Sequence, residues 1–234
     1  MLASKYGLPA ITYRLQRGFR DEDIAMGVGC LAMVPAVAGG VVYSRNPVDP
    51  HDARIFINAV WGLPKAVVDG STACDLFVLS RGDPPELLAA EVREKERKYL
   101  CYPEEGVCRL ELTGPERLQP ALGNGQAVAL ARIALALERH YGAPQDIEWA
   151  TDEAGDIVIL QCRPLAATEP PVVAEAPPGQ KEESPLCGGG VTASPGAGAG
   201  PVFVAERAAD LLSFPQGAVL VVHQALPRWA SLLG

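Results

Sequence analysis

The 234-residue sequence predicts an α+β fold, and three observations predict it. Short apolar runs, bounded by glycine, proline and other turn residues, are typical of strands. A longer run with apolar residues at helical spacing, residues 126–141, is typical of a helix that covers a sheet. The hydrophobic content of 48% is enough for one sizeable core and part of a second.

The predicted strands come first along the chain. Residues 25–44 are apolar and rich in glycine, which predicts a strand, a turn at Pro35 and a second strand. Residues 55–60 and 76–80 predict two further strands. We expect all of them to build one sheet.

Two helices are predicted. Residues 86–100 follow a pair of prolines and favour a solvated helix with two i,i+4 acid–base pairs, Glu91 with Lys95 and Glu94 with Lys98. Residues 126–141 predict the covering helix, and Gly142 is a suitable C-terminal stop. Its apolar stripe consists of Leu130, Ile133, Ala134, Leu137 and Tyr141.

A hairpin follows the second helix, and it carries the most informative residues. Residues 146–149 and 159–164 alternate apolar with polar side chains, and residues 152–156 have the composition of a turn. If Asp152 lies opposite Ile157, four polar side chains share one face, with Asp146 opposite Arg163 and Glu148 opposite Gln161. The apolar face would then be made by Ile147, Trp149, Val158 and Leu160.

The polar face suits a polyphosphate with its metal ion. Carboxylate oxygens are ligands for Mg²⁺, and Glu148 would be the main one. Arg163 offers a planar fork for two parallel bonds to a phosphate, and Gln161 can contact a water or an oxygen. The alternative is an ordinary exposed hairpin face, on which Asp146 and Arg163 form a surface ion pair worth roughly 0–1 kcal/mol.

Residues 138–150 together with 159–164 resemble the end of the ATP-grasp domain in the family of phosphoenolpyruvate synthases, pyruvate phosphate dikinases and rifampicin phosphotransferases. Residues 33–47, 58–63 and 67–70 resemble further strands and loops of that domain, and residues 194–202 resemble the opening of the phosphohistidine domain that follows it. The resemblance implies that Mg-ATP is held by Asp146, Glu148, Gln161 and Arg163, with Glu148 and Gln161 on the metal.

The sequence departs from the family pattern at two places near the expected nucleotide. Relatives often have glutamine at the adenine hinge where this chain has Leu31, so adenine would contact the backbone of Ala32, Met33 and Val34. Pro64-Lys65 replaces the Gly-Glu found in many relatives, which reverses a charge near the expected ribose or metal.

The resemblance implies a partial ATP-grasp domain, with a mixed or antiparallel sheet and covering helices, at residues 1–167. Residues 168–186 are rich in proline and polar residues and predict a linker. Residues 187–234 would begin a β/β/α swivelling phosphohistidine domain, with strands near 202–205 and 218–223 and a short helix at 208–212. Glycine-rich 188–200 lacks the Gly-Lys-Ser/Thr of a phosphate loop.

The reaction implied is that of a dikinase, in which ATP, pyruvate and water give AMP, phosphoenolpyruvate and phosphate through a phosphohistidine. We interpret the chain as an internal fragment that lacks the N-terminal ATP-grasp subdomain and the phosphoryl-carrier histidine, and expect it to be inactive alone. His223 is interpreted as a strand-end residue. The alternatives are an antibiotic phosphotransferase, a pyruvate phosphate dikinase, a degenerate nucleotide-binding module without activity, and a plain structural β-rich domain.

Composition narrows the function classes further. A formal net charge of −8 argues against a nucleic-acid partner. There is no run long enough to span a bilayer and no basic-plus-apolar leader. The six cysteines show no metal-like or disulfide-like spacing and are predicted to be small buried residues in a reducing compartment, which indicates a cytoplasmic protein.

Overall fold

The computed structural model describes residues 2–49, 51–165, 197–206, 210 and 213–222. These residues fall into two compact units, one within 34–197 and the other within 1–33 and 198–234, and each unit is described by itself. The predicted linker and His223 lie outside the described residues.

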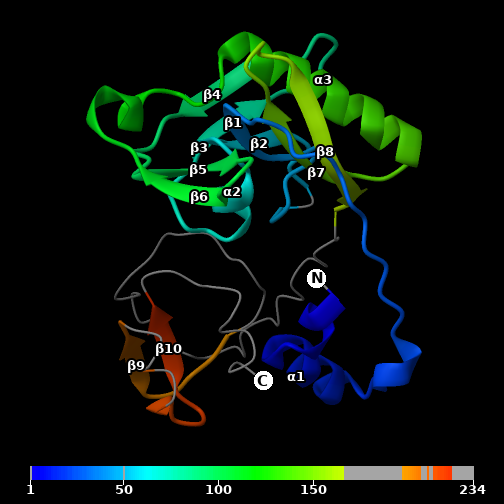
Figure 1. The fold of residues 1–234 in the computed structure, drawn as a ribbon, viewed down its shortest axis with the longest axis vertical. Coiled ribbons are helices and arrows are strands. Elements are labelled where there is room, and N and C mark those ends of the chain that lie inside the picture. The colour runs from blue at the N-terminus through cyan, green and yellow to red at the C-terminus, as the bar shows by residue number, and fades with distance from the viewer. Residues whose placement is uncertain (1, 50, 166–196, 207–209, 211–212, 223–234) are drawn as a thin grey trace, which may run out of the picture. The chain divides into compact units, whose positions relative to one another are not determined.

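The larger unit is built on a six-stranded sheet in the order β4-β3-β2-β1-β7-β8, in which every neighbouring pair is antiparallel. Its strands are β1 (Ala38–Tyr43), β2 (Ile55–Trp61), β3 (Asp75–Leu79), β4 (Leu87–Glu91), β7 (Gln145–Thr151) and β8 (Ile157–Pro164). The antiparallel sheet with few helices confirms the α+β class (Figure 1).

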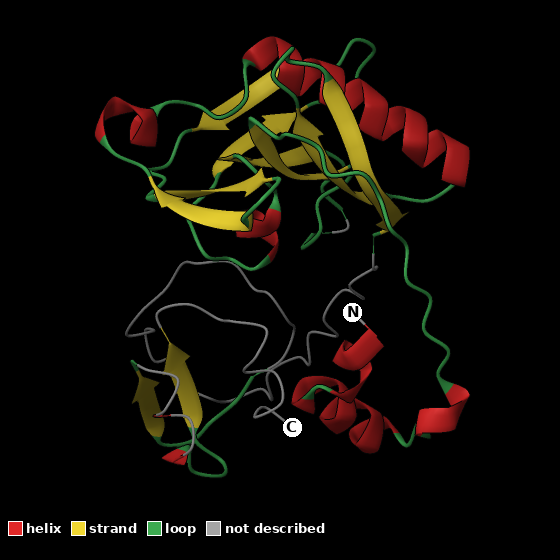
Figure 2. Ribbon diagram, viewed as in Figure 1, coloured by secondary structure: helices red, strands yellow, loops and turns green. Residues whose placement is uncertain are grey.

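The two faces of this sheet are covered differently. Helix α3 (Asn124–Tyr141) packs on one face and closes the main core, which includes Ile57, Phe77, Leu130 and Trp149. On the other face lie the short helix α2 (Lys65–Val68) and the hairpin of β5 (Arg97–Tyr102) and β6 (Gly106–Glu111), around a smaller cluster (Figure 2). That second cluster is centred on Ala36, Leu63 and Ala150.

Helix α3 was predicted at this position, and its predicted C-terminal stop at Gly142 is confirmed. It ends at Gly142, which adopts φ +69°, a conformation that glycine accepts without a steric penalty. The buried stripe is shifted from the predicted one, because Ile133 and Leu137 are only half-buried and Tyr141 is 58% exposed. The helix instead buries small residues against the sheet: Ala127, Ala131 and Ala134, with Leu130.

The predicted helix at residues 86–100 is wrong: this segment forms β4, a connection and β5. The reason is a buried ion pair between Lys95 and Asp75, whose side chains are both 0% exposed. Asp75 also accepts backbone N–H bonds from Arg93 (3.0 Å) and Ala121 (2.8 Å). A solvated helix would hold Lys95 in water, whereas the observed path buries it beside β3.

Two other predictions about local structure are wrong. Residues 25–33 have no regular secondary structure and Leu31 is 84% exposed, so the first of the two strands predicted before Ser44 is absent. Alternating glycines at 27 and 29 leave this segment few side chains to pack. The cysteines are also less buried than predicted, and none of these five forms a disulfide: Cys30 is exposed, and Cys74, Cys101, Cys108 and Cys162 are half-buried.

The smaller unit contains α1 (Leu8–Arg17) and a parallel pair of short strands, β9 (Val202–Ala205) and β10 (Val219–Val222). Both strands lie where the sequence predicted them. The short helix predicted at 208–212 falls mostly on residues outside the described part. No helix in the described ranges is long and apolar enough to cross a membrane.

The centre of the sheet depends on a close approach at Gly40. This residue pairs with Ala59 of β2 and Trp149 of β7. A Cβ at position 40 would lie 1.8 Å from the carbonyl oxygen of Asn58, so a side chain there would push the two strands apart.

We therefore expect Gly40→Ala to lower the free energy of unfolding by about 3 kcal/mol or more, measured by urea denaturation. Gly125→Ala is the matched control, because nothing lies within 4 Å of the added Cβ and position 125 is in α3. That change should raise stability by about 0.5–1 kcal/mol. Equal effects of the two changes would contradict the packing described for β1.

An ion pair attaches the turn that follows β3 to helix α3. Arg81 contacts both carboxylate oxygens of Glu138, at 2.7 and 3.1 Å, and also donates to the carbonyl of Ser44. Burial of Glu138 acts to raise its pKa, but the hydrogen bonds from Arg81 and Ser44 outweigh this, so the pKa is lowered.

A lowered pKa in the folded state gives stability that is present above the ordinary glutamate value of about 4.3 and is lost as the pH falls through the folded value. We expect the melting temperature of the wild type to exceed that of Glu138→Gln at pH 7. The difference should shrink below about pH 4. A difference that stays constant from pH 7 to pH 3 would show that the charge of Glu138 contributes nothing.

Candidate functional site

The candidate site is the polar face of the β7–β8 hairpin. The connecting turn is closed by the Asp152 side chain, whose Oδ1 accepts from the backbone N–H of Ala154 (3.0 Å) and Asp156 (2.9 Å). Gly155 adopts φ +85°, which a residue with a side chain rarely does. These local interactions set where the two strands start to pair.

The pairing brings the four predicted side chains together across the strands. Asp146 lies opposite Arg163 and Glu148 lies opposite Gln161, as predicted. The other end of the hairpin differs, because Thr151 and not Asp152 lies opposite Ile157. The register changes by one residue between Glu148 and Trp149, where the hairpin has a β-bulge.

The bulge also corrects the predicted apolar face. Ile147 and Trp149 are fully buried in the main core, as predicted. Their partners from β8 are Ile157, Ile159 and Cys162, which pack against that core in place of Val158 and Leu160. Leu160 packs instead on the second cluster, beside Ala150. One extra residue in β8 therefore reverses the faces of its first half while leaving Gln161 and Arg163 opposite the carboxylates.

Arg163 and Asp146 form the best-defined contact of this face. Nη2 and Nε of Arg163 lie 2.7 and 3.0 Å from Oδ2 of Asp146. The Asp146 side chain is 13% exposed and that of Arg163 is 65% exposed, so the carboxylate is sheltered while the guanidinium reaches solvent. The hydrogen bond to Asp146 raises the pKa of Arg163 and holds its guanidinium beside that carboxylate.

Glu148 differs from Asp146 in having no such partner. It is half-buried between Val41 of β1 and Gln161 of β8, and no described residue donates a hydrogen bond to its carboxylate. Gln161 is exposed beside it. A free carboxylate with a neighbouring amide supplies oxygen donors that suit a hard cation such as Mg²⁺.

The described residues contain no group of three or more His, Cys, Asp or Glu side chains that could hold a metal. The Glu148 region therefore does not resemble a site that encloses an ion with protein ligands alone. It fits an ion that takes one or two protein oxygens and completes its coordination with water and phosphate, which is the usual manner of Mg²⁺ at nucleotides.

Sequence reasoning missed Tyr43, which lies on β1 directly opposite Asp146. Burial raises the pKa of the Tyr43 hydroxyl, and the nearby carboxylates of Asp146 and Glu148 raise it further. Asn58 of β2 extends the same face, and its Oδ1 lies 3.5 Å from Sγ of Cys74. The two-residue alternation of β1 and β2 was the signal that could have found both residues.

The three residues predicted at the adenine hinge are divided between the two compact units. Val34 packs against the second cluster, whereas Ala32 and Met33 are exposed and belong to the other compact unit, so the hinge stays a prediction. A hollow of about 400 Å³ begins at the next residue, Pro35. Its lining includes Val37, Leu100, Tyr102 and Glu153.

The departure at Pro64-Lys65 has a local explanation. Pro64 caps α2, and Nζ of Lys65 lies 2.6 Å from the carboxylate of Asp69 one turn later. The hydrogen bond to Asp69 raises the pKa of Lys65. The reversed charge is therefore matched within α2.

Comparison with known proteins relates most of this sequence to one family. Residues 1–184 match the family model described as the AMP/ATP-binding domain of pyruvate phosphate dikinase. The phosphoenolpyruvate synthase of Pyrococcus furiosus is 33% identical over 232 residues, which cover 96% of this chain and 28% of that protein. Probable phosphoenolpyruvate synthases of Pyrococcus horikoshii and Archaeoglobus fulgidus are 33% and 31% identical. The chain thus spans little more than a quarter of these relatives' length.

The electrostatics of this face can be tested through Tyr43, whose pKa we expect above the ordinary value of about 10. Asp146→Asn removes a negative charge beside the hydroxyl and should therefore lower that pKa. Tyrosinate absorbance measures it, with Tyr43→Phe identifying the signal of this residue among the others. Asp156→Asn, in the exposed turn, is the matched control, and an equal response to both asparagine variants would contradict the arrangement.

Proposed function

The chain belongs to the family of the pyruvate phosphate dikinase AMP/ATP-binding domain, and we propose that its β7–β8 face holds the phosphates of ATP and an associated Mg²⁺. The observation that carries this proposal is the pairing of Asp146 with Arg163 and of Glu148 with Gln161 on one face. An ordinary surface ion pair would account for Asp146 and Arg163 but not for the unpaired Glu148 beside them.

Each side chain has a distinct role in this proposal. Asp146 holds the Arg163 guanidinium in place, so that its fork is oriented before the phosphate arrives. Glu148 and Gln161 offer oxygens to the metal. When bound, Mg²⁺ neutralises negative charge on the phosphate oxygens.

The base would lie in the hollow at Pro35–Val37. Two residues that line it, Ala36 and Cys101, belong to the second cluster, which also contains Ala150 from the strand that carries Glu148. The volume of about 400 Å³ is within the range of small-molecule sites, about 300–1,000 Å³. Apolar side chains there would exclude water from one edge of the base.

In the whole protein we propose phosphoenolpyruvate synthase-like chemistry, in which ATP, pyruvate and water give AMP, phosphoenolpyruvate and phosphate. The support is the family match together with relatives named phosphoenolpyruvate synthase. A phosphohistidine would carry the phosphoryl group. The contribution of this chain is positioning and charge stabilisation, which dominate phosphoryl transfer.

A second candidate is a nucleotide-binding module without transfer activity. It is favoured by the exposed Leu31 at the predicted hinge and by Lys65, whose charge is satisfied by Asp69. A phosphotransferase acting on an antibiotic, or a pyruvate phosphate dikinase, would use the same ATP face and differ in the acceptor. In the whole protein, formation of AMP from ATP distinguishes a transferase from the inactive module, and its dependence on pyruvate distinguishes a pyruvate dikinase from an antibiotic phosphotransferase.

The metal assignment is tested by calorimetric titration of ATP with and without Mg²⁺. Glu148→Gln keeps the shape of the side chain but removes its charge, so it should weaken Mg²⁺-dependent ATP binding by about tenfold or more. Binding without Mg²⁺ should be equal or tighter, because a negative charge beside the phosphates is gone. Asp156→Asn removes a carboxylate charge from the exposed turn, outside the hollow, and should leave the Mg²⁺ dependence unaltered.

The role of Arg163 is tested by Arg163→Lys, which keeps the charge but cannot form two parallel bonds to one phosphate. We expect ATP affinity to fall about tenfold whether or not Mg²⁺ is present, measured by the same titration. Unchanged affinity in both Glu148→Gln and Arg163→Lys would contradict the proposed site.

A further inference from the structure

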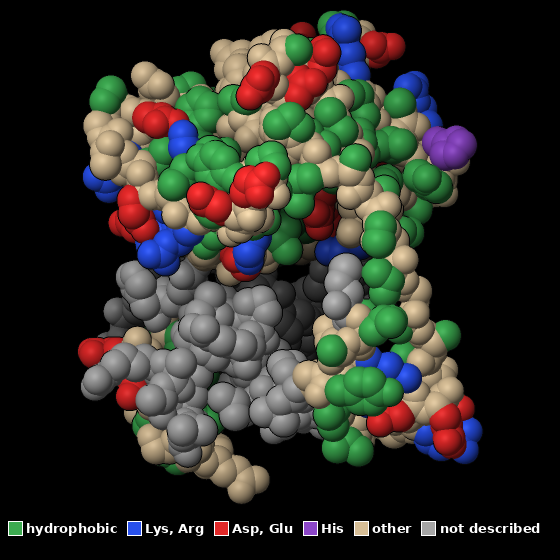
Figure 3. All heavy atoms as spheres, viewed as in Figure 1, with side chains coloured by type: hydrophobic (Ala, Val, Ile, Leu, Met, Phe, Trp, Pro, Cys, Tyr) green, Lys and Arg blue, Asp and Glu red, His purple; other side chains and the backbone are tan. Residues whose placement is uncertain are grey.

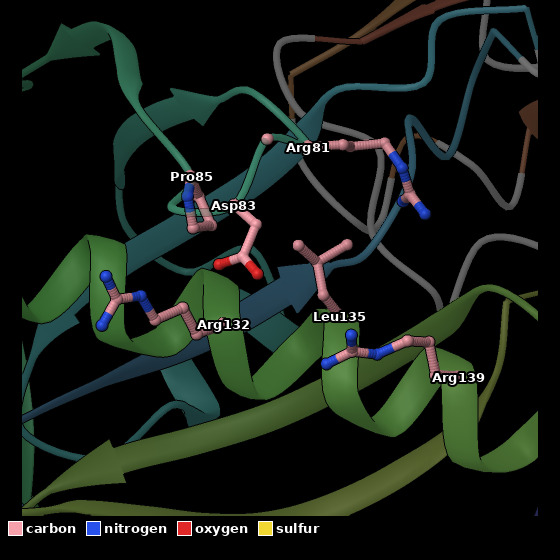
Figure 4. Close-up of a pocket in the computed structure, with 7 residues that line it drawn as sticks. Arg81, Asp83, Pro85, Arg132, Leu135 and Arg139 are labelled. Atoms are coloured by element: carbon pink, nitrogen blue, oxygen red, sulfur yellow. The ribbon is translucent and has the colours of Figure 1, made fainter.

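A second hollow, of about 220 Å³, lies between α3 and the turn that connects β3 with β4. Figure 4 shows Arg132, Leu135 and Arg139 projecting from α3 beneath this turn, and Asp83 directing its carboxylate towards the helix. Because α3 covers the face of the sheet opposite Glu148, this hollow is separate from the proposed nucleotide face.

Its walls are held in place by contacts of their own. The backbone N–H of Ser80 donates to the carbonyl of Glu86 (2.9 Å), and the backbone N–H of Glu86 donates to Oγ of Ser80 (2.9 Å). Pro85 is buried under the turn, and Arg81 ties the start of the turn to Glu138 of α3. The hollow is therefore formed before any ligand arrives.

The side chains that line the hollow carry more positive than negative charge. The charge of Arg81 is matched by Glu138, and Figure 4 shows Arg81 extending away from Asp83. Arg132 and Arg139 are exposed, and no carboxylate among the described residues forms an ion pair with either of them. Asp83 is the one carboxylate that lines the hollow, so two cations face a single anion.

The spacing of the two cations suits a small ligand. Arg132 and Arg139 are two helical turns apart on the same side of α3, about 10 Å along its axis, with Leu135 between them. Figure 4 shows the guanidinium of Arg139 directed towards Leu135 and that of Arg132 directed away from it, so Arg132 would change its side-chain conformation to meet the same anion. Figure 3 shows acidic and basic side chains intermixed over the visible surface of the larger unit.

We propose that this hollow is a second binding site, for a small oxyanion with a carboxylate or phosphate group held by Arg132 and Arg139. Guanidinium groups are donors only, and their fork fits both kinds of oxyanion. The volume is below the 300–1,000 Å³ of drug-sized sites, which favours a molecule of few atoms. Asp83 opposes the anion and so limits its affinity.

The test is titration of inorganic phosphate and, separately, malonate into the 234-residue chain at low ionic strength, followed by backbone amide NMR shifts. Shifts should concentrate at residues 81–85 and 132–139. Arg132→Gln and Arg139→Gln should each weaken binding by about tenfold. Arg109→Gln removes another exposed positive charge, on β6, and should change binding less than twofold. Asp83→Asn should tighten binding.

The two anions identify the ligand chemistry: tighter phosphate indicates a phosphate group, and tighter malonate indicates a carboxylate. Binding of neither anion at millimolar concentration would overturn the proposal. So would loss of phosphate binding in Arg163→Gln with full binding in Arg132→Gln, because the anion would then occupy the β7–β8 face. The proposal does not depend on the nucleotide site, since ATP affinity should be unchanged in the Arg132 and Arg139 variants.

Discussion

The pairing of β7 with β8 is the constraint on which the functional interpretation depends. Side chains on a strand alternate between faces, so a pairing shifted by one residue would separate Glu148 from Gln161 and Asp146 from Arg163. The bulge at Glu148/Trp149 reconciles two requirements. It lets Ile157 and Ile159 reach the core near the turn, and it returns the polar residues to the opposite face further along.

Packing elsewhere in the larger unit stabilises this pairing. Trp149 and Ile147 fix β7 against α3, while Gly40 lets β1 lie close to its neighbours. The buried Asp75–Lys95 pair ties β3 to the segment that leads into β5. Removal of either partner would leave a buried charge, which costs about 3–5 kcal/mol. One face of the sheet thus contributes stability, and part of the other carries the polar side chains of the proposed site.

Local patterns in the sequence were enough to predict much of this arrangement. The alternation at 146–149 and 159–164 predicted the hairpin and its polar face, and apolar spacing with Gly142 predicted α3 and its end. Residues 86–100 were misread because helical charge spacing is a local signal, whereas the burial of Lys95 depends on Asp75, 20 residues away. The bulge was missed for a similar reason, because it depends on the packing of β8 against α3, which is distant in sequence. Tyr43 was missed because β1 was considered only as an apolar strand.

The most direct test of the account uses Mn²⁺ in place of Mg²⁺, because bound Mn²⁺ broadens the NMR signals of nearby nuclei. With Mn²⁺ and a non-hydrolysable ATP analogue added to the chain, we expect the amide signals of residues 146–148 and 161–163 to be lost first, together with that of Val41. Signals from the exposed face of α3 should persist. Broadening centred on α3 or on the β5–β6 hairpin, with the β7–β8 signals unaffected, would contradict the central claim that this hairpin face holds the metal-bound nucleotide.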